Sequence, residues 1–119
     1  MIVCVPTEGD GGIDGSVAGQ FGQAVTFTLF DTSTNGIRVI PNRGGPDGAN
    51  GTTSRYLPEE KFEAVLAGKL GNDAMADFRK KGIWVYLGAR GTVLDAITSW
   101  RNGRLQRATV DTAHEDHQH

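Results

Sequence analysis

Residues 62–105 contain two consecutive copies of one pattern, in which an apolar strand, a glycine loop and an amphipathic helix follow one another. The predicted strands are 64–67 and 83–87, and helices are expected to start at Asn72 and at Thr92. Consecutive strand–helix units in one sheet give parallel strands joined by right-handed crossovers. The segment therefore predicts an α/β fold, whose ligands would lie beyond the carboxyl ends of the strands.

The ends of both helices carry recognisable signals. Asn72 is predicted to cap the first helix with its side-chain oxygen, and Gly82 to end it in the left-handed conformation. Thr92 and Asp95 have the spacing of a capping box, with Asp in place of the usual Glu. The dipeptide 102–103, Asn-Gly, is expected to end the second helix.

The first third of the chain predicts three more strands. Residues 2–5 form a continuous apolar run, which is typical of a strand buried on both faces, and Pro6 is expected to end it. Residues 26–30 are rich in β-branched and aromatic side chains. The Asn-Gly pair at 35–36 predicts a hairpin, from which residues 37–40 return antiparallel.

Residues 54–61 are ambiguous on their own. Pro58, followed by two glutamates, suits the first turn of a helix. A helix running through Phe62 to Leu66 is therefore an alternative to the strand predicted there, and so short a stretch cannot be decided by periodicity.

Glycine is unusually frequent and unevenly placed. The chain has 17 glycines in 119 residues, about twice the usual ~7%. The predicted strand directions bring loops 7–22, 42–53, 68–72 and 88–92 to one sheet edge, with six, four, two and two glycines. Such loops can present backbone N–H groups and helix starts to an anion, although each is also explained as a simple mobile turn.

Composition restricts the class of protein. The net charge is −2 and the pI is near 5.8, which gives no general reason to bind nucleic acid or an anionic membrane. The longest apolar run is about five residues, against ~20 for a membrane span. A single cysteine allows neither an internal disulfide nor a paired-cysteine metal site. Without a recognisable leader, the expected location is cytoplasmic.

Several short motifs, taken in order, resemble one family. The chain is similar in these places to the dinitrogenase iron–molybdenum cofactor biosynthesis family, which includes NifX-like and NifB-associated domains and nitrogenase accessory factors. The motifs are Ile2-Val3-Cys4-Val5-Pro6, Phe21-Gly22-Gln23-Ala24 with Phe27 and Asp31, Ala67-Gly68-Lys69-Leu70-Gly71-Asn72, Gly82-Ile83-Trp84-Val85-Tyr86, and Gly91-Thr92-Val93 with Ala96.

The resemblance implies a fold and a role. The fold would be a three-layer α/β/α arrangement with a five-stranded mixed sheet of order 3-2-1-4-5, a ribonuclease H-like motif in which residues 62–67 form a strand. Residues 1–108 would form one domain, and 109–119 a polar, disordered tail. The family's role is to bind or carry iron–sulfur or iron–molybdenum cluster species during cofactor assembly, which implies an assembly partner protein.

The chain also departs from the family pattern. Gln20 stands where members often have histidine before the phenylalanine-glycine pair, Asp47-Gly48 stands where they often have histidine-glycine, and Pro58 interrupts the region of their first helix. Since metal–sulfur clusters prefer soft ligands, these departures leave a second hypothesis open. In it the protein is a metal-free interaction or regulatory module of the same fold.

Candidate site residues follow from the glycine edge and the resemblance. Lys69 and Arg90, each in a glycine loop, are predicted to hold an anionic ligand, with two solvated cations as the alternative. His114, His117 and His119 are candidate metal ligands, although a disordered polar tail, which is commoner at a chain end, also explains them. The candidate cofactor-binding set is Gly9, Gly11, Gly12, Gln20, Gly22, Asp47, Gly48, Gly68, Lys69, Gly71, Gly88, Arg90 and Gly91.

Enzymatic functions are poorly supported by the sequence. Nuclease chemistry on a ribonuclease H-like fold needs carboxylates around metal ions, and residues 2–5 contain none. The chain has no phosphate-binding loop of the GxxxxGK[ST] type, and its three histidines all lie in the tail. Cys4, Trp84 and Trp100 are expected to be core residues. We therefore predict a non-enzymatic binding protein.

Overall fold

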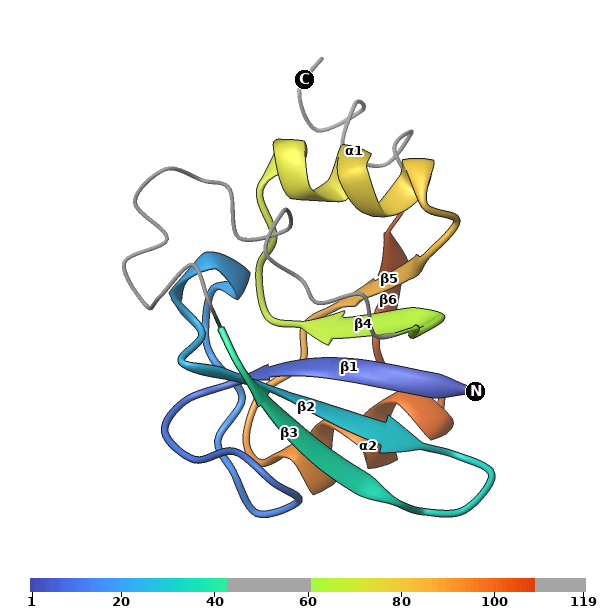
Figure 1. Cartoon of the computed structure of the whole chain (residues 1–119). Helices are drawn as coiled ribbons and strands as arrows, with labels where there is room; N and C mark the ends of the chain where they lie inside the picture. The colour runs from blue at the N-terminus through green and yellow to red at the C-terminus, as the bar shows by residue number, and fades with distance from the viewer. Residues whose placement is uncertain (43–60, 109–119) are drawn as a thin grey trace.

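The structure is a computed structural model that describes residues 1–42 and 61–108. Its centre is one mixed sheet of six strands in the order β3-β2-β1-β4-β5-β6 (Figure 1). The strands are β1 (Ile2–Thr7), β2 (Thr26–Asp31), β3 (Ile37–Pro41), β4 (Ala64–Ala67), β5 (Trp84–Leu87) and β6 (Gln106–Ala108). The helices are the 3₁₀ turn η1 (Phe21–Gln23), α1 (Asn72–Lys80) and α2 (Val93–Arg101).

The strand directions confirm the predicted arrangement of five strands. β1 is parallel to β4 and β4 to β5, whereas β2 is antiparallel to both β1 and β3. The carboxyl ends of β1, β3, β4 and β5 therefore share one edge of the sheet. We call it the carboxyl edge.

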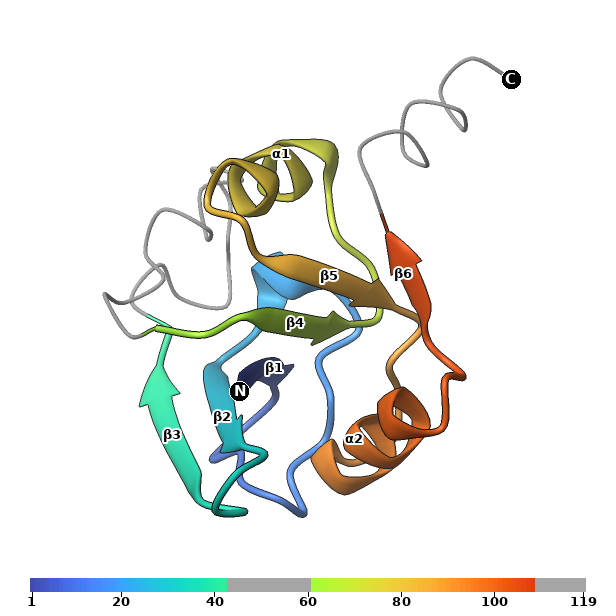
Figure 2. The ribbon, with the colours of Figure 1, turned by 90° about the vertical axis from the view of Figure 1, so that its right-hand side faces the viewer.

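The prediction of only five strands was wrong, because β6 pairs antiparallel with β5. Figure 2 shows β6 as the outermost strand on the side opposite β3. β6 is three residues long and mostly exposed, so it carries no apolar run or alternation that the sequence could reveal.

Alternation along β1 separates two cores, one under each helix. Cys4 faces the cluster that includes Phe27 and Phe78 of α1, while its neighbours Val3 and Val5 face the cluster of α2. Figure 1 shows α1 and α2 on opposite sides of the sheet, as in a three-layer fold. None of the described helices is long and apolar enough to cross a membrane.

Two predictions about where elements begin or end need correction. β1 continues through Pro6 to Thr7, because β4 pairs only with Val3 and Cys4, so Pro6 lies beyond the pairing on that side. The N-cap of α1 is Gly71 rather than Asn72, which is the first helical residue. The N–H of Met75 donates to the carbonyl of Gly71 at 3.0 Å, and the carbonyl that accepts the first helical bond belongs to the N-cap residue, so the cap lies one position earlier than predicted.

Trp84 was also wrongly expected to lie in the core, since it is 45% exposed. It is the first residue of β5 and faces the same side as Tyr86, which Trp100 of α2 contacts edge-to-face at 6.1 Å. Trp84 is covered instead by Arg107, whose guanidinium carbon lies 4.3 Å from the ring centroid.

The remaining helix predictions are confirmed. Gly82 has a φ of 73°, and Thr92 and Asp95 form both bonds of the capping box. The helix considered as an alternative through Phe62 to Leu66 is not formed, because β4 is a strand at Ala64–Ala67. Residues 54–60, the glycines of the second loop and the tail 109–119 lie outside the described residues.

Candidate anion-binding groove

Three loops meet at the carboxyl edge and are joined by backbone hydrogen bonds. The N–H of Phe21 donates to the carbonyl of Lys69 at 3.1 Å, and Gln20 forms a parallel bridge with the same residue. The N–H of Gly88 donates to the carbonyl of Gly68 at 3.3 Å. The loops after β1, β4 and β5 therefore hold one another in place.

Gly68 is the point of closest approach between these loops. A Cβ atom on Gly68 would lie 2.8 Å from the carbonyl oxygen of Gly19 and 3.2 Å from that of Ala89. Real Cβ atoms do not approach backbone oxygens so closely, so only glycine allows the three loops to pack at this distance.

An open groove of about 500 Å³ lies along this edge. Three cationic side chains, Lys69, Arg90 and Arg104, line it, and none of the described residues that line it is acidic, histidine or cysteine. The full lining is Gly19, Gly68, Lys69, Gly88, Ala89, Arg90, Ser99, Arg104 and Leu105. Glycine backbone, one hydroxyl and three cations are groups that bind an anion.

The helix starts contribute less to this site than the sequence suggested. At the start of α2 the N–H groups of Val93 and Leu94 donate to the carbonyls of Gly15 and Ile13, at 2.8 and 3.0 Å. Those of Thr92 and Asp95 are used in the capping box. The positive character of the groove therefore comes from its side chains rather than from the α2 dipole.

The glycines near the start of the first loop lie elsewhere. Gly9, Gly11 and Gly12, all with positive φ, do not line the groove. The N–H of Gly12 donates to Thr28 Oγ1 at 3.0 Å, and Thr26 Oγ1 donates to the carbonyl of Gly9 at 3.0 Å. These glycines hold the loop over the threonines of β1 and β2.

The other predicted residues fall into two groups. Lys69, Arg90, Gly68 and Gly88 are brought together in the groove. The remainder that the structure describes, Gln20, Gly22, Gly71 and Gly91, are not among its lining residues. Asp47, Gly48 and the tail histidines lie outside the described residues.

Sequence reasoning missed the three groove residues that follow loop 88–92 in the chain. Ser99, Arg104 and Leu105 come from the end of α2 and the turn into β6, and their contribution depends on the unpredicted sixth strand. The signal available was Gly103, whose φ of 71° turns the chain and which directly precedes Arg104.

Cys4 is not available as a ligand. It is completely buried in β1, and burial raises the pKa of its thiol far above the usual range. The thiolate, rather than the thiol, binds metals. Within residues 1–42 and 61–108, no three histidine, cysteine, aspartate or glutamate side chains are grouped to hold a metal ion.

Comparison with known proteins decides the family. The model of the family described as dinitrogenase iron-molybdenum cofactor matches residues 1–103, which is nearly the whole chain. The chain belongs to this family. A comparison with curated protein sequences gave no match.

Solved structures with the same fold agree with that assignment. The chain is similar to the apo form of the orange protein from Desulfovibrio gigas, with 27% identity, a TM-score of 0.79 and coverage of 90% and 92% of the two chains. A Thermotoga protein provisionally called NifB shows 26% identity and a TM-score of 0.67, over 89% and 91%. A Methanocaldococcus jannaschii protein provisionally called a dinitrogenase, at 15% identity and a TM-score of 0.62, shares the fold.

Proposed function

We propose that this protein binds and carries an anionic metal–sulfur cluster, or a precursor of one, during the assembly of an iron–sulfur or iron–molybdenum cofactor. The groove at the carboxyl edge is its site, and the protein catalyses no reaction. The observation that carries the proposal is the presence of Lys69, Arg90 and Arg104 around one groove in a chain of this family.

The groove suits a cluster held without covalent ligands. Iron–sulfur clusters are ordinarily held by cysteine thiolates, and the lining of the groove contains none. A cluster rich in sulfide carries net negative charge, so cationic side chains and backbone N–H groups can bind its sulfur atoms instead. Because such contacts are weaker than metal–thiolate bonds, the cargo can be released intact, as a carrier requires.

The test is anaerobic titration with two probes, tetrathiomolybdate and isolated iron–molybdenum cofactor. We expect a coloured species that co-elutes with the protein on gel filtration. The Lys69→Ala/Arg90→Ala double variant should bind at least about tenfold more weakly, since one charge-assisted contact contributes ~1.5–3 kcal/mol and exposure lowers that figure. Binding should also weaken as the salt concentration rises.

The matched control is Lys80→Ala/Lys81→Ala, which removes two exposed cations at the end of α1. It changes the net charge by the same amount outside the groove and should bind as the unchanged protein does. Equal binding by both double variants, or no coloured species with either probe, would show that the groove is not the site.

The metal-free interaction module remains the competing hypothesis. Its motivation is Gln20, an exposed residue in the position of a family histidine. Elemental analysis of protein purified without an added histidine tag separates the two. Stoichiometric iron, molybdenum or copper would contradict the module, and its loss in the Lys69→Ala/Arg90→Ala variant would assign that metal to the groove.

A further inference from the structure

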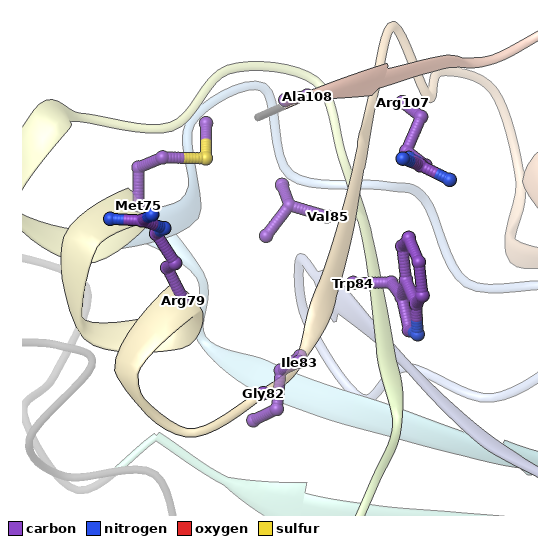
Figure 3. A pocket seen from close by; sticks show the side chains of 8 residues that line it. All are labelled: Met75, Arg79, Gly82, Ile83, Trp84, Val85, Arg107 and Ala108. Carbon is purple, nitrogen blue, oxygen red and sulfur yellow. The ribbon is translucent and has the colours of Figure 1, made fainter. Parts of the chain in front are cut away.

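A second hollow lies at the opposite end of β5 from the groove. It has a volume of about 240 Å³ and is lined by residues from α1, from the start of β5 and from β6 (Figure 3). The lining residues are Met75, Arg79, Gly82, Ile83, Trp84, Val85, Arg107 and Ala108. We call this hollow the β5–β6 pocket.

The pocket has an apolar wall, and an aromatic–cationic pair lies across the β5 ribbon from that wall. Met75, Val85 and Ala108 belong to the core cluster under α1. Trp84 and Val85 are neighbours on one strand and point to opposite sides of the sheet. In Figure 3 the Trp84 ring therefore lies with Arg107 on the other side of the β5 ribbon from Met75 and Arg79.

These residue types are those of a protein-binding surface. Tryptophan, methionine and arginine are enriched in interfaces, and tryptophan and arginine dominate binding hot spots. Small-molecule sites are usually about 300–1,000 Å³, so a hollow of 240 Å³ suits one large side chain of a partner better than a free cofactor.

The charge around the pocket indicates that the partner's binding segment is negatively charged. Arg79 and Arg107 line the pocket, and no acidic residue does so in the described part of the chain. Lys80 and Lys81 are exposed beside it at the end of α1. Cations at a helix carboxyl end also offset the helix dipole, but Arg107 lies on a strand, where that explanation does not apply.

Strand addition does not explain how a partner would bind here. β6 is the outer strand of the described sheet, and within the described residues it spans Gln106–Ala108, with charged Arg107 at its centre. Short, charged edge strands are a feature that prevents pairing with other chains. Recognition would therefore depend on side chains entering the pocket.

We propose that the β5–β6 pocket docks an acidic segment of a partner protein, which inserts one large apolar side chain against Met75 and Val85. Carboxylates on either side of that anchor pair with Arg79 and Arg107. Because the groove lies at the other end of β5, a docked partner leaves it open. This proposal does not depend on what the groove binds.

The test is a selection of short random peptides displayed on phage against the full-length protein. Selected sequences are resynthesised with a fluorescent label, and their dissociation constants are measured by anisotropy. We expect acidic peptides with a single leucine or aromatic residue, and about tenfold weaker binding to Arg107→Gln and to Arg79→Gln. Arg107→Lys keeps the charge but loses the planar stacking on Trp84. Its dissociation constant should therefore lie between those of the unchanged protein and of Arg107→Gln.

Two controls make the result specific. Lys69→Ala/Arg90→Ala should bind the peptides with unchanged affinity, and Arg107→Gln should bind tetrathiomolybdate with unchanged affinity. The proposals for the groove and for the β5–β6 pocket are therefore tested independently. The indole N–H signal of Trp84 in two-dimensional NMR reports both folding of each variant and peptide contact.

Selected peptides without acidic residues, or binding by Arg79→Gln and Arg107→Gln as tight as by the unchanged protein, would overturn the proposal. Peptide binding that appears only after removal of residues 109–119 would also overturn the proposal, because residues 109–119 of this chain would then be the segment that occupies the pocket. Unchanged binding after that removal would support an external partner.

Discussion

The two strand–loop–helix units follow one plan in the sequence, but they are built differently where each helix begins. At α2, Thr92 and Asp95 form a capping box, and the first two helical N–H groups donate to carbonyls of the first loop. At α1, Gly71 occupies the cap position and supplies no side-chain hydrogen bond. The second unit is therefore fixed to the rest of the molecule at its helix start. The first unit is fixed by the loop that precedes its helix, through the backbone bonds of Gly68 and Lys69.

The difference shows how the groove is formed. The backbone of the loop after β4 is tied to η1 through Lys69 and to the loop after β5 through Gly68. The Lys69 side chain is exposed and reaches the groove together with Arg90 from the second unit. Backbone contacts between the loops thus place two exposed cations, one from each unit, around the same groove, which an isolated copy of either unit would not do.

The largest effect is expected at Gly68, where the units touch. In Gly68→Ala the new Cβ would lie 2.8 Å from the Gly19 carbonyl oxygen, so the loops must separate. We expect a loss of about 1–3 kcal/mol in the free energy of unfolding, as for overpacked sites. Tetrathiomolybdate binding should weaken too, because Gly19 and Gly68 both line the groove. Chemical denaturation and the titration above measure the two effects.

Gly19→Ala is the matched control, since a Cβ there meets nothing within 4 Å and its φ is not positive. It should keep or slightly raise stability, because alanine restricts the unfolded chain. If both variants lose the same stability, close approach at Gly68 is not what holds the loops together.

How far the sequence could predict this arrangement depended on how local each signal was. The capping box, Gly82 and the directions of β1 to β5 follow from short patterns and from connection rules, whereas the order of these strands was implied by the family resemblance; the structure contains all of them. Arg104 was out of reach, because it joins the groove only through the turn into β6, a strand without a periodic pattern. The exposure of Trp84 could not be predicted either, because it depends on how β5 is covered in the folded chain and not on the local pattern of the strand.

A smaller effect is expected at the capped helix. Thr92→Ala removes the hydroxyl that accepts from the Asp95 N–H at 3.1 Å and leaves α2 without its side-chain cap. The loss should be about 1 kcal/mol in the free energy of unfolding. Thr92→Ser retains the hydroxyl and should recover most of it. Thermal and urea unfolding of both variants check this, and equal losses would mean that the methyl group rather than the cap is responsible.

The smallest effect, and of opposite sign, is expected at Gly71. Its φ of −71° and ψ of 161° are extended, and a Cβ there meets nothing within 4 Å, so serine fits without strain. The new hydroxyl can accept from an N–H in the first turn of α1 and should raise stability by a few tenths of a kcal/mol. Gly71→Ala, which adds the Cβ but no acceptor, should be less stable than Gly71→Ser by about 1 kcal/mol. Gly71 does not line the groove, so tetrathiomolybdate should bind both variants equally. If Gly71→Ser is no more stable than Gly71→Ala, the N–H groups at the start of α1 already have hydrogen-bond partners. The two units would then differ in their loop contacts but not in how well their helix starts are capped.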